Sequence, residues 1–260
     1  MSTAPERYVD WINENVGFNP RGQGHSDFLT ACIVEDLRAR CPLIAEKFNA
    51  HSLELRQNVG LTGRRHMSPL AHGGADDEDD GSEIDPNIDG VILGTKLHTE
   101  GAPVTAPITL ENKTIMTAHG KARTNRYNDA RAYASHVHNA SPATIAAFTI
   151  VINAALAYRN PDAFARTAKS SGQNTAAAAR STIQMFTAMR LRDEPGDPVG
   201  RCEAVLVLAI DYDGVSPTAR LVMEEPAPPL ASPFGYEGFL DRICELYERR
   251  FAVRADLRRE

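Results

Sequence analysis

Three residues on two apolar segments carry the side chains that metal-assisted hydrolysis requires. Asp89 lies in the apolar segment 88–93, and Glu111 and Lys113 follow a second apolar segment about twenty residues later. Successive side chains of a strand alternate between its faces, so Glu111 and Lys113 would point one way and Asn112 the other. Two carboxylates and an ammonium group on adjacent strands would form a site for a hard divalent cation and an activated water.

Each of these residues can be given a chemical role. Asp89 and Glu111 are expected to bind one or two Mg²⁺ ions, with the backbone carbonyl of Asn112 as a further ligand. Lys113 would lie beside the attacking water, lower the pKa of that water and stabilise the charge of a phosphorane. The alternative is that Asp89 begins a turn with Gly90, while Glu111 and Lys113 form a surface ion pair at a strand end.

Asp, then about twenty residues, then Glu-x-Lys resembles the motif of the PD-(D/E)xK nuclease superfamily, and the resemblance covers roughly residues 26–153. It implies a core of helix, three strands, helix and strand. The size and the loop-rich additions are similar to those of type II restriction endonucleases and phage-defence nucleases. The resemblance therefore implies Mg²⁺-dependent cleavage of double-stranded DNA, with Mn²⁺ able to substitute, commonly by a homodimer.

The chain departs from this pattern at the first acid. The residue before Asp89 is Ile88, whereas Asp85 is next to a proline, so the choice between Asp85 and Asp89 stays open. Asp89 is preferred because it lies at the edge of the expected strand. The superfamily often adds an acid from the helix before the sheet, and Glu35 occupies such a place, although it could equally be a solvated helix charge.

A basic segment follows the Glu-x-Lys fragment, with no acid before Asp129. Positive side chains beside a metal site suit contacts to nucleic-acid phosphates. The alternative is that this segment pairs with the acidic run 76–80. The expected nucleic-acid-binding residues are His119, Lys121, Arg123, Asn125 and Arg126.

The composition excludes few function classes. The chain has 260 residues, 42% apolar content and a formal net charge of −6. Much of the acidic excess falls within 76–85, so the overall charge argues only weakly against a polyanionic substrate. The four cysteines are widely spaced and are expected to be buried thiols. With no signal-peptide pattern and no apolar run of membrane-spanning length, a cytoplasmic, reduced protein is expected.

The element pattern predicts an α/β fold, with a mixed central sheet flanked by helices and a restriction-endonuclease-like core. Strands are expected at 88–93, 108–111, 144–153 and 203–211. Helices are expected at 26–40, with Ser26 as N-cap, and at 122–139, 161–190 and 236–251. One nuclease-like domain over 1–260 follows, with its core at 26–153 and helical and strand additions at 154–260. The helical stretch 161–190 could enter a DNA groove or pack a dimer.

Spacing argues against two other sites. His136 and His138 would point about 200° apart on a helix, which disfavours a joint metal site. The glycines of segment 22–24 do not begin a phosphate-binding loop of the right length.

Three functions fit these residues. The first is a Mg²⁺-dependent endodeoxyribonuclease, the second is a non-catalytic nucleic-acid-binding or assembly protein that keeps the nuclease fold, and the third is an enzyme with the same metal chemistry acting on RNA. The recognition sequence depends on loop geometry, which residue types leave open.

Overall fold

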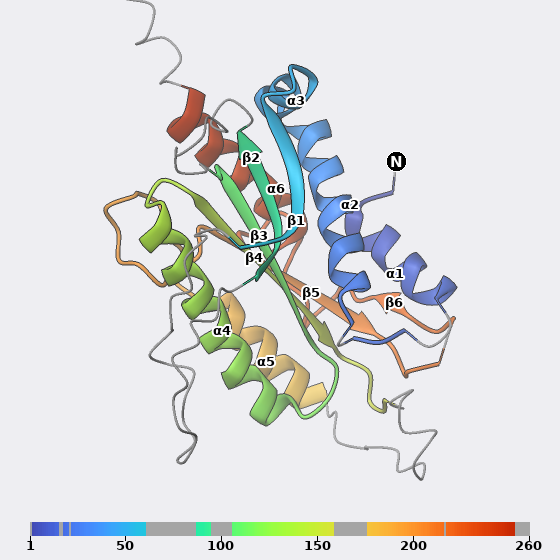
Figure 1. Ribbon diagram of the computed structural model, residues 1–260. Helices are drawn as coiled ribbons and strands as arrows, with labels where there is room; N and C mark the ends of the chain where they lie inside the picture. Colours follow the sequence, from blue (N-terminus) through green and yellow to red (C-terminus); the bar gives the residue numbers. More distant parts are fainter. Residues whose placement is uncertain are drawn as a thin grey trace, which may run out of the picture.

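A six-stranded sheet, with its strands side by side in chain order, forms the centre of the computed structural model (Figure 1). The structure describes residues 2–15, 18–20, 22–60, 87–94, 106–158, 176–215 and 217–252. The strands are β1 (Leu53–Gly60), β2 (Asn87–Gly94), β3 (Ile108–Ile115), β4 (Ile145–Asn153), β5 (Ala204–Asp211) and β6 (Arg220–Leu221).

The strand directions make the sheet mixed. β2 runs antiparallel to both of its neighbours, β1 and β3. The strands β3, β4 and β5 are parallel, and β6 returns antiparallel to β5. The central strands β4 and β5 are buried almost throughout, as expected of parallel strands covered on both faces. The expected mixed α/β sheet flanked by helices is therefore confirmed.

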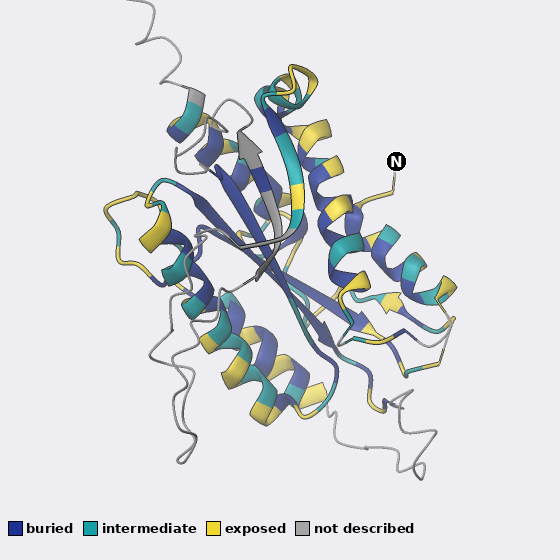
Figure 2. Cartoon of the chain, in the orientation of Figure 1, coloured by how far each residue is buried: buried dark blue, intermediate teal, exposed yellow. Residues whose placement is uncertain are grey.

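Helices cover both faces of the sheet and make three layers. One face packs against α2, with α1 and α6 beside it, and the other packs against α4 and α5. Figure 2 shows dark, buried strands between helices whose outer sides are exposed. The helices are α1 (Ala4–Glu14), α2 (Gly24–Arg40), α3 (Pro42–Asn49), α4 (His119–Ala140), α5 (Ala176–Thr187) and α6 (Tyr236–Tyr247), followed by the π-helical turn η3 (Glu248–Ala252).

Several boundaries differ from the sequence expectation. The strand expected to stop at Glu111 continues to Ile115, because Thr114 and Ile115 still pair with β4. Helix α2 begins at Gly24 rather than after Ser26, so Ser26 lies inside the first turn and is not the N-cap. Of the expected helix 161–190, residues 161–175 lie outside the described residues, and the helix ends at Thr187 rather than at Arg190.

The segment 154–260, which was expected as an addition to the core, supplies a central strand of the sheet. β5 pairs along its length with β4, and α6 packs against both of these strands. The short strand β6, which the sequence pattern did not predict, then extends the sheet beyond β5.

A buried carboxylate joins the elements at the start of β5. Glu203 is fully buried and accepts hydrogen bonds from His138 Nε2 (2.9 Å), Arg192 Nη1 (2.9 Å), Arg250 Nη1 (3.0 Å) and the backbone N–H of Ala146 (2.9 Å). Burial alone would raise the pKa of Glu203, but the hydrogen bond and charge of His138 and the charge of Arg250 outweigh it. The pKa therefore falls below its ordinary value of 4.5.

Two cysteines differ from the expectation of four buried thiols. Cys41 and Cys244 form a disulfide between the end of α2 and α6, with their Cα atoms 5.6 Å apart. Cys32 and Cys202 are buried thiols, as expected. The paired cysteines are 203 residues apart in the sequence, so their spacing gave no sign of the contact. No helix in the described part of the chain combines the length and the apolarity needed to cross a membrane.

The buried network predicts a large stability loss for Glu203→Gln. The substitution leaves the guanidinium groups of Arg192 and Arg250 buried at this point without their carboxylate, at a cost on the order of 3–5 kcal/mol. Because folding lowers the pKa of Glu203, its stabilisation is complete above about pH 4.5 and is lost as the pH falls through the folded-state pKa. Urea denaturation at a series of pH values measures both effects.

Glu245→Gln is the control, since Glu245 is an exposed carboxylate on α6. Its expected effect on the free energy of unfolding is within about 0.5 kcal/mol. Equal denaturation midpoints for the two variants would show that the network contributes nothing specific.

Candidate active site

The alternation of side chains along β3 divides the expected site residues between two faces of the sheet. Asn112 points toward α2, where its side-chain amide donates hydrogen bonds to Thr30 Oγ1 (2.7 Å), Ser26 Oγ (3.2 Å) and the backbone carbonyl of Ser26 (3.2 Å). Glu111 and Lys113 therefore point to the opposite face from Asn112, as the sequence predicted, and α4 covers that face. Only the backbone carbonyl of Asn112, not its amide, remains a candidate metal ligand.

Glu111 and Lys113 form an ion pair between Oε1 and Nζ. The carboxylate is largely buried, with 9% of the Glu111 side chain exposed, whereas 28% of the Lys113 side chain is exposed. The negative charge of Glu111 also reaches the α4 layer. Burial raises the pKa of Tyr133 and of Cys202, and the charge of Glu111 adds to both shifts.

The sheet places Asp89 on the strand beside Glu111. In the antiparallel pairing of β2 with β3, Gly90 lies opposite Leu110. One step further along, the same register brings residue 89 of β2 opposite residue 111 of β3. Asp89 and Glu111 are therefore neighbours in the sheet at the level of the backbone. Asp85, the alternative ligand, lies outside the described residues.

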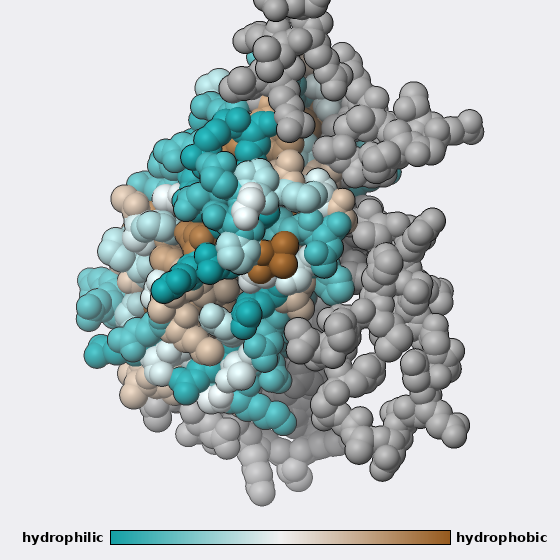
Figure 3. All heavy atoms as spheres, turned by 90° about the vertical axis from the view of Figure 1, so that its left-hand side faces the viewer, coloured by the Kyte–Doolittle hydropathy of each residue, from teal (hydrophilic) through white to brown (hydrophobic). Residues whose placement is uncertain are grey.

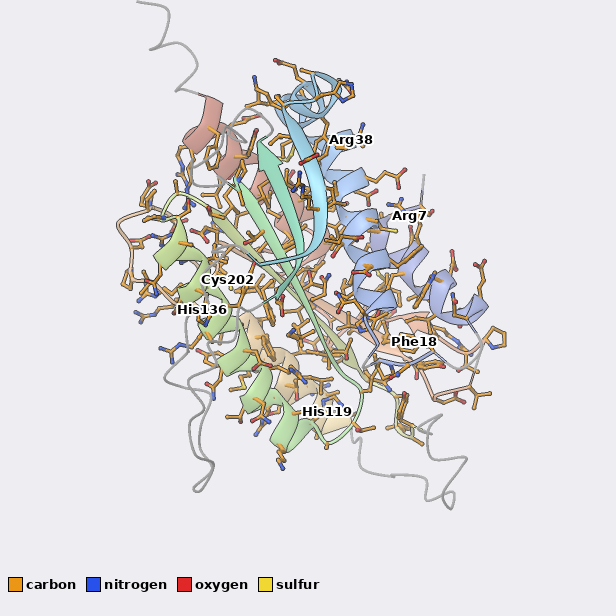
Figure 4. All side chains as sticks on the ribbon, viewed as in Figure 1. Arg7, Phe18, Arg38, His119, His136 and Cys202 are labelled. Carbon is orange, nitrogen blue, oxygen red and sulfur yellow. A yellow bond between two sulfur atoms is a disulfide. The ribbon has the colours of Figure 1, made fainter. Side chains whose placement is uncertain are left out.

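Glu35 does not join this group. Its side chain is 73% exposed, and its carboxylate lies 3.4 Å from the guanidinium of Arg7 on α1. The same guanidinium donates to Asp36 (2.7 Å) and to the carbonyl of Cys32 (3.0 Å). Figure 4 shows Arg7 beside α2 on its outer side. The catalytic role expected for Glu35 is wrong in this arrangement, because α2 turns this residue away from β3.

A pocket that the sequence did not predict adjoins Lys113. It has a volume of about 360 Å³ and lies where β3 leaves the sheet, between the first turns of α2 and α4. The pairing of β3 with β4 continues to Ile115, so the residues of β3 that line the pocket lie at the end of the strand that leads into α4. The lining residues come from segments 19–20, 22–26, 112–117 and 122–126 and include Tyr158.

The basic segment supplies only part of the expected nucleic-acid surface. Lys121 and Asn125 are exposed, and Arg126 lines the pocket while pairing with Asp129 (2.5 Å). Arg123 donates to Ser181 Oγ of α5. Figure 3 faces the side on which α4 lies and shows mainly hydrophilic described residues there.

His119 is not part of that surface. It is 2% exposed, its Nδ1 lies 3.3 Å from Thr182 Oγ1 of α5, and burial lowers its pKa. The expected role of His119 in nucleic-acid binding is therefore wrong, because the imidazole fastens the start of α4 to α5 (Figure 4).

The two later histidines do not form a joint site. His138 is hydrogen-bonded to Glu203 inside the fold. His136, two residues earlier on α4, is half-buried. Among the described residues, no three His, Cys, Asp or Glu side chains gather as a metal site. The chain matches no family model, no curated protein and no solved structure.

The turn that places the pocket contains a strained residue. Ala118 joins β3 to α4 with φ 52° and ψ 44°, in the left-handed region. This conformation costs a residue with a Cβ about 1–2 kcal/mol and costs glycine almost nothing, although glycine loses more chain entropy on folding. We therefore expect Ala118→Gly to raise the free energy of unfolding by up to about 1 kcal/mol in thermal or urea denaturation.

The control is the same substitution inside a helix. Ala31 is exposed within α2, and Ala31→Gly is expected to lower stability by roughly 0.5–1 kcal/mol. A loss of stability in both variants would contradict a strained turn at Ala118.

Proposed function

We propose that this protein is a Mg²⁺-dependent endonuclease that hydrolyses phosphodiester bonds of double-stranded DNA, as a type II restriction or phage-defence nuclease with a restriction-endonuclease-like core. One observation carries the proposal. The backbone of Asp89 and the Glu111–Lys113 ion pair lie at the same level of two adjacent strands, next to a pocket that Lys113 lines.

The order of elements supports this assignment. The PD-(D/E)xK resemblance implies a helix, three strands, a helix and a fourth strand. The chain has α2 and α3 before the antiparallel strands β1, β2 and β3, then α4, then β4 parallel to β3. Asp89 falls on the second of these strands and Glu111 on the third, which are the positions that the resemblance implies.

A second Glu-x-basic pair in the same sheet shows what an ordinary surface pair looks like. On β1, Arg56 Nη2 lies 2.7 Å from Glu54 Oε1, and both side chains are well exposed, at 47% and 39%. The carboxylate of Glu111 is far more buried than that of Glu54, and α4 covers its face of the sheet. A charge held in a low-dielectric site costs desolvation energy, which a purely structural surface pair does not require.

The oxygen atoms available here fit Mg²⁺ or Mn²⁺. The carboxylate of Glu111 and the backbone carbonyl of Asn112 are hard oxygen donors on consecutive residues, and Asp89 would add a second carboxylate from β2. When bound, the cation supplies a metal-activated water and neutralises phosphate charge.

Side chains of the protein would position the phosphate group and the catalytic residues. Lys113 lines the pocket and its ammonium group is held beside Glu111, a position from which it would bind a phosphate oxygen and stabilise negative charge that develops during attack. The anchoring of Asn112 to Thr30 fixes β3 against α2, which keeps Glu111 and Lys113 in register on the opposite face.

The activity test uses Glu111→Gln and Lys113→Met, because each keeps the shape of its side chain and removes its charge. Purified protein with Mg²⁺ is expected to cut plasmid and phage DNA, and each variant is expected to lose at least about 100-fold in cleavage rate. Circular dichroism checks that each variant is folded.

Glu54→Gln and Arg56→Met are the matched controls, since they alter the exposed pair with the same spacing. They are expected to cleave at the wild-type rate. Cleavage that survives in both Glu111→Gln and Lys113→Met would remove these residues from the mechanism.

The second candidate is a non-catalytic nucleic-acid-binding or assembly protein with the same fold. One observation favours this second function: the carboxylate of Glu111 is paired with Lys113, and Glu111 does not line the pocket. This function predicts DNA binding of equal strength in EDTA and in Mg²⁺, with no cleavage of DNA or RNA. Gel-shift and digestion assays on both polymers separate it from the nuclease.

A further inference from the structure

The pocket between the first turns of α2 and α4 has the chemistry of an anion site. We propose that it binds a phosphate group of the nucleic-acid strand, next to the phosphate that is hydrolysed. This inference rests on the proposed nuclease function, because it names the neighbouring substrate group that the same protein holds. The volume of about 360 Å³ lies within the range of small-ligand sites, about 300–1,000 Å³.

The lining side chains are positive or neutral. Lys113, Arg126 and His25 line the pocket, and the described lining includes no aspartate or glutamate. A concave site with charges of one sign concentrates ions of the opposite sign. The pocket therefore favours an anion over a cation or an apolar ligand.

The acid that pairs with Arg126 lies outside the pocket lining. Asp129 accepts from Arg126 Nη1 (2.5 Å) but does not line the pocket. A guanidinium group has five N–H donors. Asp129 thus holds Arg126 in place, while the guanidinium retains capacity to bind phosphate oxygens.

Hydroxyl and amide groups complete the lining. Ser26, Thr114, Thr117 and Gln23, which all have polar side chains, are among the lining residues. Phosphate oxygens accept hydrogen bonds from such groups as well as from arginine and lysine. The lining therefore matches a phosphate group better than a carboxylate, which has fewer oxygens to satisfy.

The imidazole of His25, one of the lining residues, is held by aromatic neighbours. Tyr8 OH lies 3.3 Å from His25 Nδ1, and the Phe18 ring meets the imidazole edge-on at 5.8 Å. Both aromatic side chains are buried, so His25 is fixed as a wall of the pocket. A fixed wall lets a ligand bind without the entropy cost of ordering that side chain.

Two long helices begin at this pocket and add to its positive potential. α2 has 17 residues and starts at Gly24, and α4 has 22 residues and starts at His119. A helix N-terminus carries partial positive charge and binds anions. Figure 4 shows Phe18, just before α2, and His119, at the start of α4, both toward the same end of the sheet.

The test measures binding without catalysis, in EDTA. Inorganic phosphate is titrated calorimetrically into the full-length wild-type protein and into three variants. Arg126→Gln removes one positive group, and Ala122→Leu fills the pocket while every charge stays in place. Arg131→Gln is the control, because Arg131 is an exposed arginine of α4 that does not line the pocket. We expect at least about tenfold weaker phosphate binding for the first two variants and wild-type binding for the control.

The same proteins are then tested with duplex DNA carrying either 5′-phosphate or 5′-hydroxyl ends. If the bound group is an internal phosphate, Arg126→Gln lowers affinity for both duplexes equally and reduces the slope of log affinity against log salt by about 1. If it is a terminal phosphate, the loss is confined to the 5′-phosphorylated duplex. Either result supports the phosphate pocket and identifies the source of the group.

The proposal is overturned if Arg126→Gln and Ala122→Leu bind inorganic phosphate and both duplexes as Arg131→Gln does. Its failure is distinct from failure of the nuclease. Cleavage by wild-type protein together with unchanged binding by these variants rejects the pocket and keeps the enzyme. Absence of cleavage with weakened binding keeps the phosphate pocket and rejects the hydrolase.

Discussion

The strict alternation of side chains along β3 is the constraint on which the rest of the site depends. It sends Asn112 into a hydrogen-bonded contact with α2 and sends Glu111 and Lys113 toward α4. A shift of one residue in the pairing of β3 with β4 would exchange these faces, burying the charges against α2 and removing the amide from Thr30. The Asn112–Thr30 contact therefore specifies the register that orients the ion pair.

This constraint also explains where the pocket lies. β3 remains paired with β4 as far as Ile115, and the left-handed residue Ala118 then turns the chain into α4. The first turns of α2 and α4 lie beside this end of β3, which brings residues distant in sequence, such as Gln23 and Arg126, to one concave surface.

The sequence predicted the features that local patterning determines. Buried parallel strands are continuous apolar runs, so β4 and β5 were predicted close to their true bounds. The adjacent positions of Asp89 and Glu111 followed from two strands that come one after the other. The true end of β3 could not be read from the charges, because Lys113 is tolerated inside a strand when Glu111 is its neighbour on the same face.

Long-range contacts account for most of the errors. α2 packs against α1, α3, α6 and the sheet, so its apolar residues occupy a broad surface and do not reveal which face meets β3. Glu35 was therefore assigned to the wrong side. His119 was counted as basic surface because nothing in its neighbourhood indicates α5, more than fifty residues later. The Cys41–Cys244 disulfide and the cluster around Glu203 likewise join segments whose spacing carries no periodic signal.

We propose above all that carboxylates from β2 and β3 bind one divalent cation. The most direct test is titration of Mn²⁺ followed by electron paramagnetic resonance, with wild-type protein, Asp89→Asn and Glu111→Gln. The account predicts that the wild-type protein binds Mn²⁺ and that each single substitution weakens this binding at least about tenfold. Equal Mn²⁺ binding by all three proteins, or no binding by the wild type, would contradict it.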